Sequence, residues 1–465
     1  MINALPQDPT KRDPKLIDVT TTSFVPLVGP FVLGVDELNK EKDKTFNITT
    51  DYIFSFEPFT NNQQHIQGNF PDKTISYLPT DLLPDYSDPK ANVNDLTSYK
   101  RYIKDNKIKS TDLLLAVPPC AGLSMLNVGN RGAGCAANMW MYETVKWHLA
   151  QDNGCLLLEN APGLVGKEGV KVLNVIEKIL EDNGVRDDYK IHTTKTSTTF
   201  HGLPQQRHRT FLFIYKAKEF KRLKNIVREQ VLLEDYFRLR NRPEKTEDGT
   251  NHIQLAPNWS SDNLKWIDKN DYWDRIRTIV DGYGAKTITD FMFKIWREEN
   301  PETFDEFPKL KKEMNRKQAK LDKGLGYWDS SPIVCKGKTN AIIAKNAFNI
   351  LHPFYNRFIT VREMMDLMGY PDDFELKGDT KKNFNHVCQS VPVKTGMDHI
   401  RWAQGIVYDD PDFVDGVIET DATVLLQKNM KGDLFNDINC LYKDDIEFGK
   451  IKTTTKRTKL KSFLK

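Results

Sequence analysis

Three short motifs bring together a nucleophile, a carboxylic acid and two cations. Cys120 ends a Pro-Pro-Cys run, Glu159 begins Glu-Asn-Ala, and Arg207 and Arg209 alternate within Gln-Gln-Arg-His-Arg. A cysteine thiolate is intrinsically nucleophilic, and a carboxyl group whose pKa is raised by burial can donate a proton. Forked guanidinium groups suit carbonyl oxygens and phosphates. These residue types predict nucleophilic chemistry with proton donation, beside a negatively charged or carbonyl-bearing substrate.

Apolar runs border all three motifs and indicate how they are positioned. Residues 113–117 and 155–158 lead into the first two motifs, and residues 211–215 follow the third. Runs of this length are typical of strands in a parallel sheet that is buried on both faces. In open α/β sheets the ligand lies outside the carboxyl ends of the strands. We therefore predict that Cys120 and Glu159 share one pocket.

The composition excludes several classes of protein. The 465 residues carry a formal net charge of only +3, which does not by itself call for nucleic acid. There is no run of about 18 apolar residues, so no membrane span is expected. Residues 1–8 lack a basic start and an apolar stretch, so no secretory signal is predicted. Six cysteines form no CxxC pair, which favours free thiols in the cytoplasm and no metal site.

Periodicity predicts an alternation of strands and helices over residues 16–215, typical of a parallel α/β sheet. Residues 136–149 repeat apolar side chains every four positions, as one face of a helix would. A second apolar stripe over residues 170–183 is followed by Gly184, where a left-handed helix cap is expected.

The composition changes after Tyr215, where charged and aromatic residues increase and strand periodicity weakens. We predict a catalytic domain over residues 1–215 and 355–405, a smaller inserted domain over residues 216–354, and a C-terminal extension over residues 406–465. The extension ends in a basic tail, for which phosphate contacts and a solvated end are equally favoured. Most tryptophans of the inserted domain are expected in its core. They are Trp259, Trp266, Trp273, Trp296 and Trp328.

The order and spacing of the motifs resemble those of the cytosine-C5 DNA methyltransferases. The resemblance also includes residues 357–363 and 368–374, which are similar to a late block of the family, and Ser-Val-Pro at residues 390–392. Matched blocks run in family order from about residue 18 to about residue 402. The resemblance implies a Rossmann-like methyltransferase sheet with an inserted target-recognition domain and double-stranded DNA in the cleft between them. It also implies a monomer of prokaryotic or viral source, associated with a restriction or defence system.

The resemblance assigns roles in a DNA (cytosine-5-)-methyltransferase reaction. Cys120 would add to C6 of a flipped-out cytosine, Glu159 would protonate N3, and C5 would take a methyl group from S-adenosylmethionine. Arg209 would contact the base, while Gln205 and Arg207 would brace the catalytic loop. The glycines within residues 121–134 suit a lid over the flipped base.

Each expected site has its own set of residues. The catalytic residues are Cys120, Glu159, Arg207 and Arg209. The DNA-binding residues are Pro119, Ser124, Asn160, Gln205, Arg207 and Arg209. The cofactor-binding residues are Phe24, Gly29, Glu57, Asp81, Pro118, Gln389 and Ser390.

Three departures from the family pattern remain. The loop at residues 24–31 keeps at most one of three usual glycines, Ala121 replaces a glutamine, and Cys388-Gln389 replaces Gly-Asn. The pocket could bind ordinary S-adenosylmethionine with altered geometry. It could instead suit a modified relative, with Lys394 meeting an added negative group, or the chain could be a DNA-binding pseudo-enzyme. The intact catalytic motifs favour the first explanation.

Overall fold

The computed structural model describes residues 16–418, with gaps at residues 43, 87, 89–90, 125–131, 133–134, 225, 227, 243–257, 328, 330, 344–348 and 378–379. The basic tail and most of the expected lid therefore lie outside the described residues. Within the described ranges, no helix is both long and apolar enough to cross a membrane.

A seven-stranded sheet forms the centre of the larger domain, in the order β3-β2-β1-β4-β5-β8-β6. Neighbouring strands are parallel except where β8 pairs antiparallel with β5 and β6. Every residue of β4 and β5 is buried, which explains their uninterrupted apolar sequence. The strands are β1 (Ile17–Phe24), β2 (Phe46–Phe56), β3 (Ile75–Leu78), β4 (Leu113–Ala116), β5 (Cys155–Asn160), β6 (Tyr189–Ser197) and β8 (His208–Lys216).

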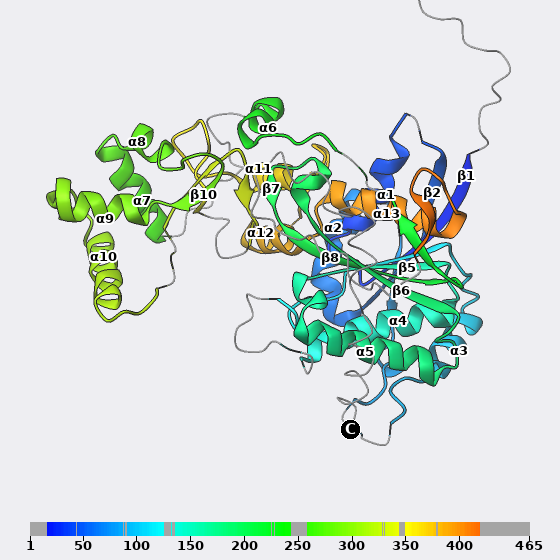
Figure 1. Ribbon diagram of the computed structural model, residues 1–465. Helices are drawn as coiled ribbons and strands as arrows, with labels where there is room; N and C mark the ends of the chain where they lie inside the picture. Colours follow the sequence, from blue (N-terminus) through cyan, green and yellow to red (C-terminus); the bar gives the residue numbers. More distant parts are fainter. Residues whose placement is uncertain are drawn as a thin grey trace, which may run out of the picture.

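Helices cover both faces of this sheet (Figure 1). One face carries α3 (Thr97–Asp105), α4 (Met139–Gln151) and α5 (Lys167–Asp182), and the other carries α1 (Pro30–Asn39) and α13 (Val393–Tyr408). The two helices predicted from periodicity are confirmed as α4, preceded by a short 3-10 turn, and α5. Gly184 has the expected positive φ, at 70°.

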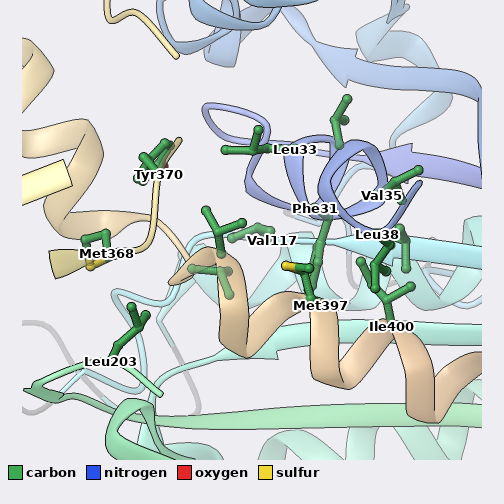
Figure 2. Close-up of a cluster of buried hydrophobic side chains, with 14 of the residues drawn as sticks. Phe31, Leu33, Val35, Leu38, Val117, Leu203, Met368, Tyr370, Met397 and Ile400 are labelled. Carbon is green, nitrogen blue, oxygen red and sulfur yellow. The ribbon is translucent and has the colours of Figure 1, made fainter. Parts of the chain in front are cut away.

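Helices α1 and α13 share a core although they come from opposite ends of the described chain (Figure 2). Met397 and Ile400 of α13 lie beside Phe31 and Leu38 of α1. The helices approach so closely that a Cβ at Gly34 would lie 3.3 Å from Cδ1 of Ile400. The returning segment therefore completes the core of the larger domain.

The remaining elements of the larger domain are two short strand pairs and four helices. Strand β9 pairs antiparallel with β13, and β7 pairs parallel with β12. They are β7 (Gln205–Gln206), β9 (Phe220–Leu223), β12 (Thr339–Asn340), β13 (Val414–Ile418), α2 (Thr60–Asn69), α6 (Leu233–Arg240), α11 (Val361–Leu367) and α12 (Thr380–Gln389).

A second hydrophobic core lies in the small domain, on the left of Figure 1. It contains residues from Trp266 to Phe358 and includes the buried Trp273. Trp296 packs against it, whereas the side chains of Trp259 and Trp328 lie outside the described residues. Its elements are α7 (Asn258–Lys269), α8 (Trp273–Arg277), β10 (Gly284–Thr287), α9 (Thr289–Lys294), α10 (Pro308–Leu321) and β11 (Ile333–Lys336).

The cores divide the chain differently from the predicted boundaries. Strand β9 and helix α6 follow residue 215 but belong to the larger domain, since Leu223, Leu233 and Tyr236 join its core. At the other end, α13 continues past residue 405, and β13 still pairs with β9. A change of composition marks the insertion, but packing decides where it begins.

Candidate active site

The strand register brings three chemically important residues to one edge of the sheet. Ala116 pairs with Leu158, so the chain beyond β4 and the end of β5 emerge side by side, carrying Cys120 and Glu159. Strand β8 runs the opposite way and therefore presents its first residues at that edge. Its Thr210 pairs with Asn160, which places Arg209 next to Glu159.

A pocket of about 450 Å³ lies at this edge. It is lined by six of the residues predicted from the sequence and five that were not predicted. The predicted ones are Pro118, Pro119, Cys120, Ser124, Glu159 and Gln389. The additional ones are Val25, Leu27, Phe59 and Ala121, and Val117 completes the wall. No sequence signal marks Phe59, whereas Val25 and Leu27 lie within the loop already noted for its missing glycines.

Glu159 is buried and paired with a single guanidinium group. Its Oε1 lies 2.6 Å from Nε of Arg209. Burial raises the pKa of the Glu159 carboxyl group, while the charges of Arg209 and Arg207 act in the opposite direction. A carboxyl group that keeps its proton to higher pH is suited to proton donation.

The Cys120 thiol lies in the same electrostatic field. Burial raises its pKa, the negative charge of Glu159 raises it further, and Arg209 and Arg207 lower it. Protonation of Glu159 therefore removes one obstacle to thiolate formation.

Arg207 and Gln205 are positioning residues rather than DNA contacts. The guanidinium group of Arg207 is wholly buried and donates to the carbonyls of Ile342 (2.9 Å), Cys388 (2.6 Å) and Ser390 (3.0 Å). Burial, with the charge of Arg209, lowers the pKa of Arg207 to about 9. These bonds hold the segment that carries Gln389 into the pocket.

The buried Gln205 works in the same way. Its Nε2 donates to the carbonyl of Leu367 at 3.0 Å, and its Oε1 accepts from the backbone of Ile342 at 3.0 Å. The direct DNA contacts expected of Gln205 and Arg207 need correction, because both side chains are fully enclosed by protein. Their hydrogen bonds brace the returning segment at residues 342, 367, 388 and 390.

Asn160 and Gly163 shape the turn after β5. Asn160 is buried, and its Oδ1 accepts from the backbone of Ala161 at 2.8 Å, so it fixes this turn and does not reach the pocket. A Cβ at Gly163 would lie only 2.2 Å from the carbonyl oxygen of Leu123. Glycine is therefore required where this turn packs on the segment following Cys120.

Positive charge gathers beside Arg209. His208 follows the buried Arg207, and its position pairs with Ser197, two residues from Lys195 on β6. Burial, together with the charges of Lys195, Arg209 and Lys338, lowers the pKa of His208 to about 4. His208 is therefore neutral near pH 7, while three cations remain around it.

The two carboxylates predicted to hold the cofactor follow the ends of neighbouring strands. Glu57 follows β2 in a 3-10 turn, Glu57–Phe59, and Asp81 follows β3 in another, Thr80–Leu82. Both side chains are exposed, and neither has a hydrogen-bond partner within the part of the chain that the structure describes. Carboxylates at strand ends are typical partners for ribose hydroxyl groups.

Phe24 and Ser390, expected at the cofactor, instead lie in the protein interior. Phe24 is fully buried and stacks on Trp147 with ring centroids 5.3 Å apart. The hydroxyl of Ser390 lies 2.6 Å from that of Tyr370. Neither residue lines the pocket.

Lys394 also lies away from the pocket lining. The charges that act on it come from Arg240, Arg228 and Asp398, and burial lowers its pKa. The structure therefore gives no support to a cofactor with an added negative group.

The loop between β1 and α1 has an unusual backbone. Val25, Leu27 and Gly29 have φ angles of 47°, 52° and 84°. Left-handed φ values are unfavourable for residues with a Cβ, by roughly 1–2 kcal/mol each. The loop thus adopts glycine-like turns at two positions without glycine, and the side chains of Val25 and Leu27 line the pocket instead.

This strain leads to a stability prediction for Leu27. Leu27→Ala and Leu27→Gly remove the same contacts beyond Cβ, but only glycine accepts the positive φ without strain. We expect Leu27→Gly to be more stable than Leu27→Ala by about 1 kcal/mol in urea unfolding. An alanine variant that is more stable by about 0.4–1 kcal/mol, the entropic cost of glycine in the unfolded chain, would show that this backbone turn is unstrained.

Residues 86–401 match the sequence family described as C-5 cytosine-specific DNA methylase, and the match covers more than half of the chain. The chain belongs to this family. The resemblance inferred from the motifs is therefore confirmed, as is the Rossmann-like α/β fold. Methylases of this family act on DNA and, in general, use S-adenosylmethionine.

Individual relatives are more distant. Type II methyltransferase M.MspI of Moraxella sp. is 29% identical over 113 residues, which cover 24% of this chain and 26% of that protein. Type II methyltransferase M.PspPI of Psychrobacter sp. (strain TA137) is 24% identical over 253 residues, covering 52% of this chain and 51% of that protein. The matched stretches thus span about half or less of these methylases.

A crystal structure of a prophage-encoded E. coli protein, assigned as a DNA modification methyltransferase, has the same fold. It superposes with a TM-score of 0.50 at 15% identity, covering 84% of this chain and 100% of that one.

Proposed function

We propose that this methylase transfers a methyl group from S-adenosylmethionine to C5 of a cytosine in double-stranded DNA. The observation that carries the proposal is the pocket that Cys120 shares with Glu159, whose carboxyl group is paired with Arg209. A nucleophile and a buried proton donor within one cavity match the two requirements of addition to a pyrimidine ring.

In the proposed reaction, the target cytosine leaves the helix stack at a cost of a few kcal/mol and enters the pocket. The Cys120 thiolate forms a bond to C6, and Glu159 transfers its proton to N3. The ring electrons released by this addition make C5 a nucleophile. Transfer of the methyl group to C5 would leave S-adenosylhomocysteine as the second product. The C5 proton is then lost to solvent while the Cys120–C6 bond breaks and returns the thiolate. N3 gives its proton back to Glu159, which restores the neutral aromatic ring.

Arg209 has two tasks in this proposal. Its Nε holds the Glu159 carboxyl group, and the remaining donors of the guanidinium group are suited to the O2 carbonyl of cytosine. The surrounding charges of Lys195 and Lys338 favour the phosphates that flank the flipped nucleotide.

Part of the pocket lining and two carboxylates outside it suit S-adenosylmethionine. Leu27 and Phe59 supply apolar walls of the pocket. The exposed carboxylates of Glu57, in the same 3-10 turn as Phe59, and of Asp81 do not line the pocket, but they suit ribose hydroxyl and adenine amino groups. When bound, the cofactor supplies an electrophilic methyl group. The side chains of Val25 and Leu27 occupy positions where glycines would leave more room, so we propose altered contacts at the methionine end.

The test is methyl transfer from S-adenosylmethionine with a labelled methyl group to mixed-sequence duplex DNA. We expect the label in 5-methylcytosine after digestion. Glu57→Ala should raise KM for the cofactor about tenfold or more, the scale of a lost hydrogen bond to a charged group, with a smaller effect on kcat. Asp51→Ala is a matched control, because Asp51 is an exposed carboxylate earlier on the same strand.

Two results would overturn the proposal. DNA binding without any label transfer would favour a DNA-binding protein that has lost the reaction. Label in another base, or at another position of cytosine, would disprove C5 as the acceptor.

A further inference from the structure

Helix α10 of the small domain carries a row of basic side chains. Lys309, Lys312, Arg316 and Lys320 recur every three or four residues, and Lys323 follows in the next turn. At 3.6 residues per turn, the four helical positions fall within an arc of about 80°. We call these five residues the basic stripe.

The basic stripe lies on the solvent side of the helix. The buried positions of α10 are Leu310, Met314 and Lys317, and they point to the small core and its polar neighbours. Lys317 is itself enclosed, with Nζ 2.9 Å from Oδ1 of Asp329. The stripe occupies a different face, where the Lys309 and Arg316 side chains are 70% and 52% exposed.

Acidic neighbours compensate only part of this charge. Lys309 lies 3.6 Å from Asp262, and Arg316 lies 2.7 Å from Glu313. Lys312, Lys320 and Lys323 have no acidic partner within ion-pair distance among the residues that the structure describes. A solvated helix commonly mixes positive and negative side chains along one face. Three cations without acidic partners on one face are therefore unusual for a surface that binds nothing.

We propose that the basic stripe binds the phosphate backbone of the DNA duplex outside the target site. The inference rests on the proposed function, because the same duplex would have to reach Cys120. From Lys309 to Lys323 the row is about 21 Å long at 1.5 Å per residue. Along the duplex axis this length corresponds to about six base pairs, at 3.4 Å per charge of one strand.

The position of α10 explains why the contact lies on flanking DNA. Figure 1 shows α10 in the small domain, on the far side from the central sheet whose edge carries the pocket. A duplex long enough to extend beyond the target would engage both the pocket and the stripe. A short duplex centred on the target would engage only the pocket.

The test compares two triple variants of the full chain. The first is Lys312→Gln, Lys320→Gln and Lys323→Gln, which removes the uncompensated charges with a residue that favours helix. The control is Lys269→Gln, Lys286→Gln and Lys294→Gln, which removes three exposed charges from α7, β10 and α9 of the same domain. Both variants change the net charge equally.

Binding to mixed-sequence duplexes of about 40 and about 12 base pairs is followed by fluorescence anisotropy over a range of salt, because each phosphate contact adds about 0.9 to the salt slope. On the long duplex, the slope of log K against log salt concentration should fall in magnitude by about two to three in the stripe variant. In the control variant it should fall by less than about one. Methyl transfer to the short duplex should keep its kcat in both variants.

Three outcomes separate the hypotheses. Equal salt slopes for the two variants on the long duplex would overturn the proposal that the basic stripe binds DNA. The stripe would then be only a solvated helix face. A loss of kcat on the short duplex in the stripe variant would place α10 at the target and also overturn flanking contact. Tight DNA binding with no methyl transfer by the unmodified chain would overturn the proposed function. The difference in salt slope between the two variants would still show whether the basic stripe binds DNA.

Discussion

Cys120→Ser should abolish covalent capture of DNA that carries 5-fluorocytosine at the target position. In the unmodified protein, Cys120 adds to C6, and fluorine at C5 prevents the proton loss that normally releases the enzyme. The complex should therefore survive denaturing electrophoresis. Serine preserves the size of the side chain, but its hydroxyl group is a far poorer nucleophile without a dedicated base.

Cys135→Ser is the matched control for this experiment, because Cys135 is the other half-buried free cysteine among the described residues. It should form the covalent complex at the normal rate. Trapping that persists in Cys120→Ser and disappears in Cys135→Ser would assign the nucleophile to Cys135. The geometry of the pocket, which contains Cys120 and not Cys135, opposes that result.

Glu159→Gln should reduce methyl transfer by about a hundredfold or more, the usual contribution of a general acid. The amide has nearly the same shape and can still hydrogen-bond to the base, so DNA binding should change little. The expected loss is therefore in kcat. A variant with near-normal turnover would show that proton donation to N3 does not depend on Glu159.

The same variant also tests the coupling between Glu159 and Cys120. Because the charge of Glu159 raises the pKa of the Cys120 thiol, its removal should move alkylation of Cys120 by iodoacetamide to lower pH. Arg209→Gln should move alkylation to higher pH, because Arg209 lowers the same pKa. Mass spectrometry of the peptide that contains Cys120 separates its reaction from those of other thiols.

The sequence predicted the parts of the site that depend on local signals. Cys120 and Glu159 each follow a short apolar run, and adjacent parallel strands necessarily release their carboxyl ends at one edge. The same reasoning found helices α4 and α5, whose apolar stripes are clear in single segments. Family motifs added Arg209, whose pairing with Glu159 the structure shows.

The remaining features depend on partners that are distant in the sequence. The motif at residues 205–209 placed Arg207 among the DNA-binding residues, but Arg207 is enclosed by carbonyls of residues 342, 388 and 390. Nothing local indicates this enclosure. The turns at Val25 and Leu27 could not be predicted from the sequence either, because a positive φ angle is normally expected at glycine. The reversed direction of β8 also requires knowledge of its neighbours.

The packing of α13 on α1 has a consequence for how the protein is made. Phe31 emerges early from the ribosome, whereas its partner Met397 is translated some 365 residues later. At typical synthesis rates of 5–20 residues per second, the first half of the sheet would wait about 20 to 70 s for the helix that covers it. During that interval its apolar face is available to chaperones and to other nascent chains. Catalytic competence is therefore acquired only at the end of translation, after the small domain has already been synthesised.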